Sequence, residues 1–207
     1  MAVAGVIGEA VIQQIVLVYS ALAAAIAIGI PLAVISLFSR FLEKTVMAMA
    51  NLVQAVPTFA VVAIVVPLIG IGFWPAIFAI LLRALLPIVK NAWIGLADVD
   101  GSAIDSGRGI GLTEWQIVRY IRFPNAWPAL FAGIKFAAIL ANSVAVLTAI
   151  IGSGGLGSLI FEGLAGVNMP TMMAGAVPAI LIALFLDLSF SWMERRLTSP
   201  GLSGERT

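Results

Sequence analysis

The residue types that carry out most enzyme chemistry are missing from this chain. Its 207 residues include neither cysteine nor histidine, which excludes disulfides, thiolate or imidazole metal sites, Ser-His-Asp triads and cysteine nucleophiles. The glycine-rich stretch 152–158 is not a phosphate loop, because Gly157 is followed by Ser158 and Leu159 rather than by Lys and then Ser or Thr. The sequence predicts a protein that is not an enzyme and has no cofactor or metal site of its own.

The composition indicates a membrane protein. Hydrophobic residues make up 62% of the chain and charged residues 10%, whereas about 25% is usual for charged residues in soluble domains. A spanning helix needs about 20 apolar residues, and hydrocarbon favours helices because every backbone amide must be paired locally. We predict one all-α integral membrane domain, 1–207, with about five spans near 11–37, 46–69, 74–96, 126–151 and 171–193.

The basic residues predict the orientation of these spans. Nine lie on one predicted side: Arg40, Lys44, Lys90, Arg108, Arg119, Arg122, Arg195, Arg196 and Arg206. The amino terminus, the 70–73 turn and the 152–170 loop carry none. By the positive-inside rule the nine face the cytoplasm, so the amino terminus lies outside and the carboxyl terminus inside. The net charge of +1 gives no reason to expect a nucleic-acid partner.

The one substantial polar stretch, the loop 97–125, carries signals for a short helix. Asp100 or Ser102 can cap a helix over 103–108. The glycines on both sides of Ile110 then permit a sharp reversal of the chain.

A second short helix is predicted over the rest of this loop. Thr113 and Gln116 have the spacing of a capping box, so the helix should run from Glu114 to Arg122 and end at Pro124. Two interpretations are open: an amphipathic helix lying on lipid headgroups, or a docking element for a cytoplasmic partner.

The spacing of residues in this loop resembles the EAA motif of ABC importer permeases. That motif has an acidic residue and two small ones, three residues, glycine, nine residues, then Ile, any residue, Leu and Pro. Here it reads Asp105-Ser106-Gly107, Gly111 and Ile121-Arg122-Phe123-Pro124. The spacing is kept throughout. The sequence departs from the motif in three places, with Asp in place of Glu, Ser-Gly in place of Ala-Ala and Phe in place of Leu.

The resemblance extends over nearly the whole chain. Segments similar to the short permease subunits of osmoprotectant importers lie at 51–60, 84–96, 104–115, 150–161, 174–181 and 192–202. That family carries glycine betaine, carnitine, choline and similar quaternary amines. The resemblance implies a type I ABC importer permease (MetI-like) fold in the inner, cytoplasmic membrane of a prokaryotic cell.

The resemblance also implies partners. Two permease subunits, identical or paralogous, form the path through the bilayer, two cytoplasmic ATPases bind ATP and Mg, and an external binding protein delivers substrate. Loop 97–125 is then the coupling element that drives alternating access. The resemblance implies that five residues hold the shape of this loop: Asp105, Gly107, Gly111, Ile121 and Pro124. It implies direct ATPase contact for Ile110, Leu112, Thr113 and Trp115, and Ser106 and Gly109 belong to the same coupling loop.

Loop 152–170 has two possible roles: a simple turn between spans, or an external gate, which the resemblance favours. Gate or path residues would be Gln54, Pro57, Arg83, Gly154, Gly155, Leu156 and Phe161. Arg83 falls near mid-bilayer. It is either a buried residue bonded to helix carbonyls or a residue of the path or of the permease dimer interface.

Lys135 and Asp187 lie at similar predicted depths in spans four and five, and we expect a structural ion pair between them. Two alternatives to the osmoprotectant permease remain open. One is an ABC permease for methionine or another amino acid. The other is a secondary transporter driven by an ion gradient, with Asp187 or Glu162 as the coupling group. A purely structural scaffold would leave Arg83 and the long loop unexplained.

Overall fold

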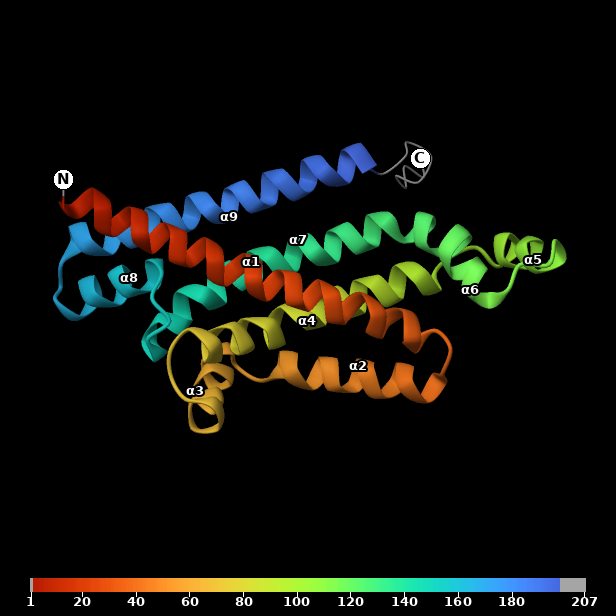
Figure 1. Ribbon diagram of the computed structural model, residues 1–207, viewed down its shortest axis with the longest axis horizontal. Coiled ribbons are helices and arrows are strands. Elements are labelled where there is room, and N and C mark those ends of the chain that lie inside the picture. The colour runs from red at the N-terminus through yellow and green to blue at the C-terminus, as the bar shows by residue number, and fades with distance from the viewer. Residues whose placement is uncertain (1, 198–207) are drawn as a thin grey trace.

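The computed structural model describes residues 2–197, and within them it contains helices and turns but no strand. Four long helices run roughly along the long axis of the molecule (Figure 1): α1 (Ala2–Ser36), α4 (Phe73–Ala97), α7 (Phe123–Thr148) and α9 (Met169–Leu197). The all-α membrane fold predicted from composition is therefore confirmed. Arg206 and the end of the segment 192–202 lie outside the described residues.

The core between α1, α4 and α7 is built from small residues. Fully buried alanines include Ala21, Ala25, Ala76, Ala79, Ala84, Ala137, Ala138, Ala141 and Ala145. Gly95 and Gly133 allow α4 and α7 to approach still closer. A Cβ at position 95 would lie 2.6 Å from Ala129 Cβ, and a Cβ at position 133 would lie 2.7 Å from Asn91 Cβ. Small residues suit a membrane bundle because close van der Waals packing, rather than hydrophobic exclusion, holds the helices together.

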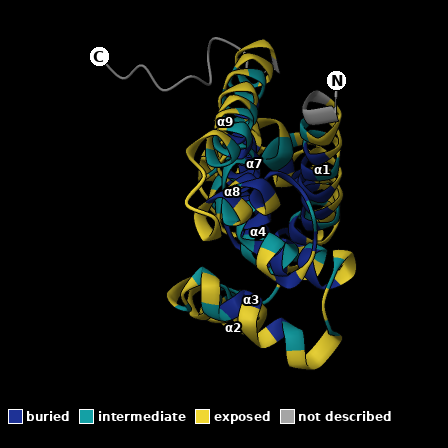
Figure 2. Ribbon diagram, turned by 90° about the vertical axis from the view of Figure 1, so that its left-hand side faces the viewer, coloured by how far each residue is buried: buried dark blue, intermediate teal, exposed yellow. Residues whose placement is uncertain are grey.

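The predicted span 46–69 is broken. It consists of α2 (Arg40–Ala55) and α3 (Thr58–Ile69), which meet at an angle of 102°. The break lies at Pro57, which has no N–H to continue the hydrogen bonding of α2. Figure 2 shows the pair beside the bundle rather than within it. Within residues 2–197, four helices are long and apolar enough to cross a membrane, and the bent pair makes a fifth if it is one span.

The prediction that Pro124 ends the loop helix is wrong. α6 (Glu114–Ile117) continues through the π-helical turn η1 (Val118–Arg122) directly into α7. Proline is tolerated here because it stands in the first turn of α7. The side chain of Asn125 donates to Ile121 O at 2.7 Å, which satisfies a carbonyl beside the wide turn.

The two candidate functional loops lie at opposite ends of the molecule. α5 (Gly101–Gly109) and α6 form one end, and α8 (Leu156–Ala165) lies near the other (Figure 1). The short 3-10 turn η2 (Ala149–Ile151) and the glycine turn 152–155 lead from α7 into α8.

Candidate functional site

Helix α5 begins with a side-chain cap. Asp100 accepts hydrogen bonds from Ser102 N and Ser102 Oγ, both at 2.9 Å. The bond from the Ser102 backbone, and then the one from its hydroxyl, holds the pKa of the Asp100 carboxyl below its usual value. Of the two capping residues that the sequence left open, Asp100 is the cap.

α5 rests on η1 through a glycine. Gly107 is buried, and a Cβ there would lie 2.5 Å from Ile121 Cδ1 and 3.5 Å from Leu112 Cδ1. Three residues of the EAA-like loop that are separated along the chain therefore meet at one apolar contact. We call the α5–α6 unit closed by this contact the knob.

The reversal between α5 and α6 depends on one of its two glycines. Gly111 adopts φ +85°, a left-handed conformation that residues with a Cβ resist. Gly109 is instead the last residue of α5. The reversal leaves Ile110 80% exposed at the tip of the knob.

Two local contacts stiffen the knob. The predicted capping box is present: Gln116 N donates to Thr113 Oγ1 and Thr113 N donates to Gln116 Oε1. Arg108 Nε donates to Glu114 Oε1 at 2.9 Å and so joins α5 to α6. This hydrogen bond and the charge of Glu114 raise the pKa of the Arg108 guanidinium. Asp105 is more distant, at 3.8 Å from Arg108 Nη1, and its side chain is largely exposed.

The knob is mounted on the bundle by Arg122, which the sequence analysis counted among the basic residues and included in the EAA-like motif without giving it a role. Arg122 Nη1 donates to Leu96 O at the end of α4. Helix carbonyls near a carboxyl terminus lack backbone donors, so a cation there is favourable. The base of the knob is therefore attached to α4 as well as to α7.

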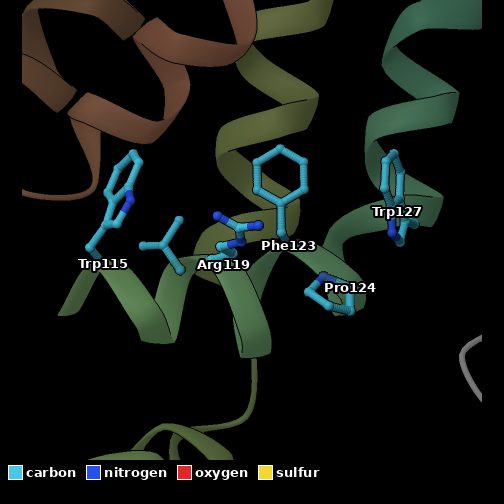
Figure 3. Close-up of a pocket in the computed structure, with 6 residues that line it drawn as sticks. Trp115, Arg119, Phe123, Pro124 and Trp127 are labelled. Carbon is cyan, nitrogen blue, oxygen red and sulfur yellow. The ribbon is translucent and has the colours of Figure 1, made fainter. Parts of the chain in front are cut away.

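One side of the helical stretch that runs from α6 through η1 into α7 is mostly aromatic. Trp115, Arg119, Phe123 and Trp127 follow one another at four-residue spacing and point to the same side (Figure 3). They line an open cavity of about 340 Å³. Trp115 also approaches Phe38, with ring centroids 6.3 Å apart, which brings the turn after α1 next to the knob.

Arg83 is bound to helix carbonyls. Its Nη1 donates to Val53 O at 2.9 Å and to Val56 O at 3.0 Å. Val53 belongs to the last turn of α2 and Val56 is the C-cap residue of that helix, next to the break at Pro57. Gln54 is exposed in the same turn. Gln54, Pro57 and Arg83 thus gather at one bend, apart from the other proposed gate residues.

Lys135 and Asp187 lie together, as their depths predicted. Lys135 Nζ is 2.8 Å from Asp187 Oδ1 and donates to Ser191 Oγ at 2.8 Å. The contact ties α7 to α9. Glu162, the other carboxylate considered for ion coupling, is exposed on α8.

The glycine turn at the other end is held by residues that the sequence analysis missed. Gly155 N donates to Gln13 Oε1 of α1 at 2.8 Å. Leu156 is fully buried and packs with Leu159, whereas Phe161 is partly exposed. Two adjacent glutamines inside an apolar span were the only sequence signal for this contact.

Comparison with known proteins gives the family. Residues 25–199 match the model of the family described as binding-protein-dependent transport system inner membrane component. The chain is 34% identical to the carnitine transport permease protein OpuCB of Listeria monocytogenes, covering 94% of this chain and 89% of the relative. It is 39% identical to the osmoprotectant import permease protein OsmY of Salmonella typhimurium, covering 90% and 80%.

A solved structure shares the fold. The chain superposes on a subunit of the inward-facing MetNI methionine ABC transporter with a TM-score of 0.87 and 22% identity, covering 94% of this chain and 97% of that one. The predicted type I importer permease fold is thereby confirmed, in a multi-pass inner membrane protein. With its family match and these relatives, the chain belongs to the binding-protein-dependent transport system inner membrane components.

Proposed function

We propose that this chain is the permease subunit of an ATP-driven ABC importer for osmoprotectants of the glycine betaine, carnitine and choline class. The observation that carries the proposal is the knob: a rigid helical projection with EAA spacing and an exposed apolar tip at Ile110, mounted on α4 and α7. The names of the relatives support the substrate class.

In this proposal the chain does not hydrolyse ATP. Two cytoplasmic ATPases hold ATP and Mg, and each receives one knob in a groove. A second permease, identical or paralogous, completes the path, and an external binding protein delivers substrate. The amino terminus lies outside and the carboxyl terminus inside.

Closure of the ATPase dimer moves the knobs together and turns the attached helices, a rigid-body form of alternating access. Gln54, Pro57 and Arg83 belong to the path, and the turn 152–155 with Leu156 and Phe161 to the external gate.

The two alternatives differ in what drives transport and in what is carried. For the amino-acid importer, the MetNI superposition supports the fold only, at 22% identity. The secondary transporter needs a free carboxylate in the membrane, and Asp187 is engaged by Lys135.

The test combines purification and transport. The tagged chain is extracted from its membrane in mild detergent, the bound proteins are identified by mass spectrometry, and the complex is reconstituted with its binding protein. We expect an ABC ATPase to co-purify and glycine betaine, carnitine or choline to be taken up with ATP. Uptake of methionine alone would replace the substrate class. Transport by the isolated chain under an ion gradient would contradict the whole proposal.

A further inference from the structure

Two adjacent residues of α1 hold the start of α8. Gly155 is the N-cap residue of α8, and having no side chain it cannot cap the helix itself. Instead its own amide donates to Gln13 Oε1, although the two residues are 142 positions apart in the chain. The turn that leads into α8 is thus tied to α1 by a side chain from α1.

The orientation of the Gln13 amide is imposed by a neighbour. Gln13 Nε2 donates to Glu9 Oε1 at 3.2 Å, one helical turn away. A carboxylate only accepts hydrogen bonds, so Glu9 holds the amide nitrogen on its own side. The Gln13 carbonyl oxygen is then left facing the turn.

Gln14 connects the same region to the bundle. It is fully buried, and its Nε2 donates to Asn142 O at 3.1 Å and to Asn142 Oδ1 at 2.9 Å. Asn142 Nδ2 in turn donates to Ala179 O at 3.0 Å, so α1, α7 and α9 share one polar chain. Gln14 Oε1 has no hydrogen-bond partner in the described part of the chain. It faces Gly155, where a Cβ would lie 2.8 Å away.

The turn fits closely against these glutamines yet keeps its shape by itself. Gly154 and Gly155 have φ of +77° and +82°, and a Cβ on Gly154 would collide with Gln13 Oε1. The turn is closed locally by Ser153 Oγ donating to Thr148 Oγ1 at 3.0 Å. Among the described residues, the bond from Gly155 N to Gln13 is the one hydrogen bond between the turn and α1.

We propose that Gln13 and Gln14 form a clasp that holds the turn 152–155 against α1 in the resting permease and releases it when the transporter opens outward. The inference rests on the proposed function. Separation of α1 from the turn breaks a single hydrogen bond between them and leaves the local bonds of both intact. Gln13 and Gln14 are thus positioning residues of the external gate.

The absence of cysteine from the chain makes a direct test possible. In the complex with its ATPases, Gln13→Cys is combined with Gly154→Cys. A Cβ at position 154 lies 3.1 Å from Gln13 Cδ, which is two bonds from the Cβ of residue 13, so small backbone fluctuations bring the two thiols together while the clasp is closed. We expect the rate of disulfide formation to fall roughly tenfold or more when the complex is trapped with ATP and vanadate, because a disulfide requires Cα atoms within about 7 Å. Equal rates in the two states would overturn the proposal.

The matched control is Thr148→Cys with Ser153→Cys, whose hydroxyl oxygens are 3.0 Å apart inside the turn. This pair should form its disulfide equally fast in both states.

A single substitution provides a second readout that does not depend on the strained position 154. Gln13→Met keeps the length of the side chain and removes the acceptor, and we expect ATP hydrolysis without binding protein to rise severalfold. Ile12→Met, on an exposed neighbouring residue, should leave hydrolysis unchanged. Basal hydrolysis unchanged in Gln13→Met would contradict the clasp. Both readouts use ATP rather than an osmolyte, so an error in the substrate class does not affect them, whereas absence of any ATPase partner would overturn both proposals.

Discussion

Gly107 is the residue on which the closure of the knob depends. The space for a side chain is limited by Ile121 Cδ1, the end of a side chain that can shift slightly. A small addition at position 107 is therefore tolerated better than a large one, because overpacking a filled contact costs about 1–3 kcal/mol.

We expect Gly107→Ala to have little effect and Gly107→Leu to displace α5, so that less ATPase co-purifies with the chain. Gly101→Leu is the matched control, since Gly101 is the first residue of the same helix, a Cβ there meets open space and the residue lies outside the EAA-like motif. Adding Ile121→Ala to Gly107→Leu should restore much of the binding. ATPase yields that are equal for the two leucine variants would show that the Gly107 contact is not needed for docking.

Arg83 acts at the scale of the elements, because it caps α2 from α4. Arg83→Met removes the donor to Val53 O and Val56 O, and unmet buried hydrogen bonds cost about 1–3 kcal/mol. We expect a lower unfolding temperature in detergent, with Arg83→Lys recovering part of the loss. The control is Lys90→Met, an exposed residue of the same helix. If Arg83→Met and Lys90→Met unfold at the same temperature, the capping role of Arg83 is wrong.

The pair between α7 and α9 can be measured by a double-mutant cycle. Lys135→Met or Asp187→Leu leaves one charge without its 2.8 Å partner, whereas the double substitution removes both charges. We expect the sum of the losses in unfolding free energy of the two single variants to exceed the loss of the double variant by roughly 0.5–3 kcal/mol. Costs that simply add would mean that the contact does not couple the two helices.

At the scale of the whole molecule, the orientation follows from which end carries the charges. The knob and the turn 152–155 lie at opposite ends (Figure 1), and the basic residues favour a cytoplasmic knob. Ile110 and Met169 are both highly exposed and lie one near each end.

Single-cysteine variants test this orientation. We expect a membrane-impermeant maleimide to label Met169→Cys in intact spheroplasts. In membranes that contain the chain without its ATPase, so that the knob is uncovered, it should label Ile110→Cys only when the vesicles are inside-out. The unmodified chain, which has no cysteine, is the blank. The reverse labelling pattern would invert the proposed topology.

Much of this protein was determined by local sequence. Composition predicted the helical membrane fold, the Thr113 and Gln116 capping box is present, and the EAA spacing pointed to the family before any comparison. These features are read along the chain itself, from its overall composition and from spacings within one loop, and they do not depend on which distant helices pack together. The continuation of α6 into α7 escaped prediction because the π-turn let Pro124 occupy a first-turn position, which the pattern alone does not reveal.

Except for Lys135 and Asp187, whose pairing was predicted from their depths, the tertiary structure alone decided which polar residues of the spans meet. Arg83 bonds to carbonyls 27 and 30 positions away, and Gln14 to Asn142 at a separation of 128. A polar residue in hydrocarbon must find a partner, so the sequence implied that each would be paired. It could not name the partner, because that depends on which helices the close packing of small residues brings side by side. The link between Gln13 and the turn 152–155 has the same origin.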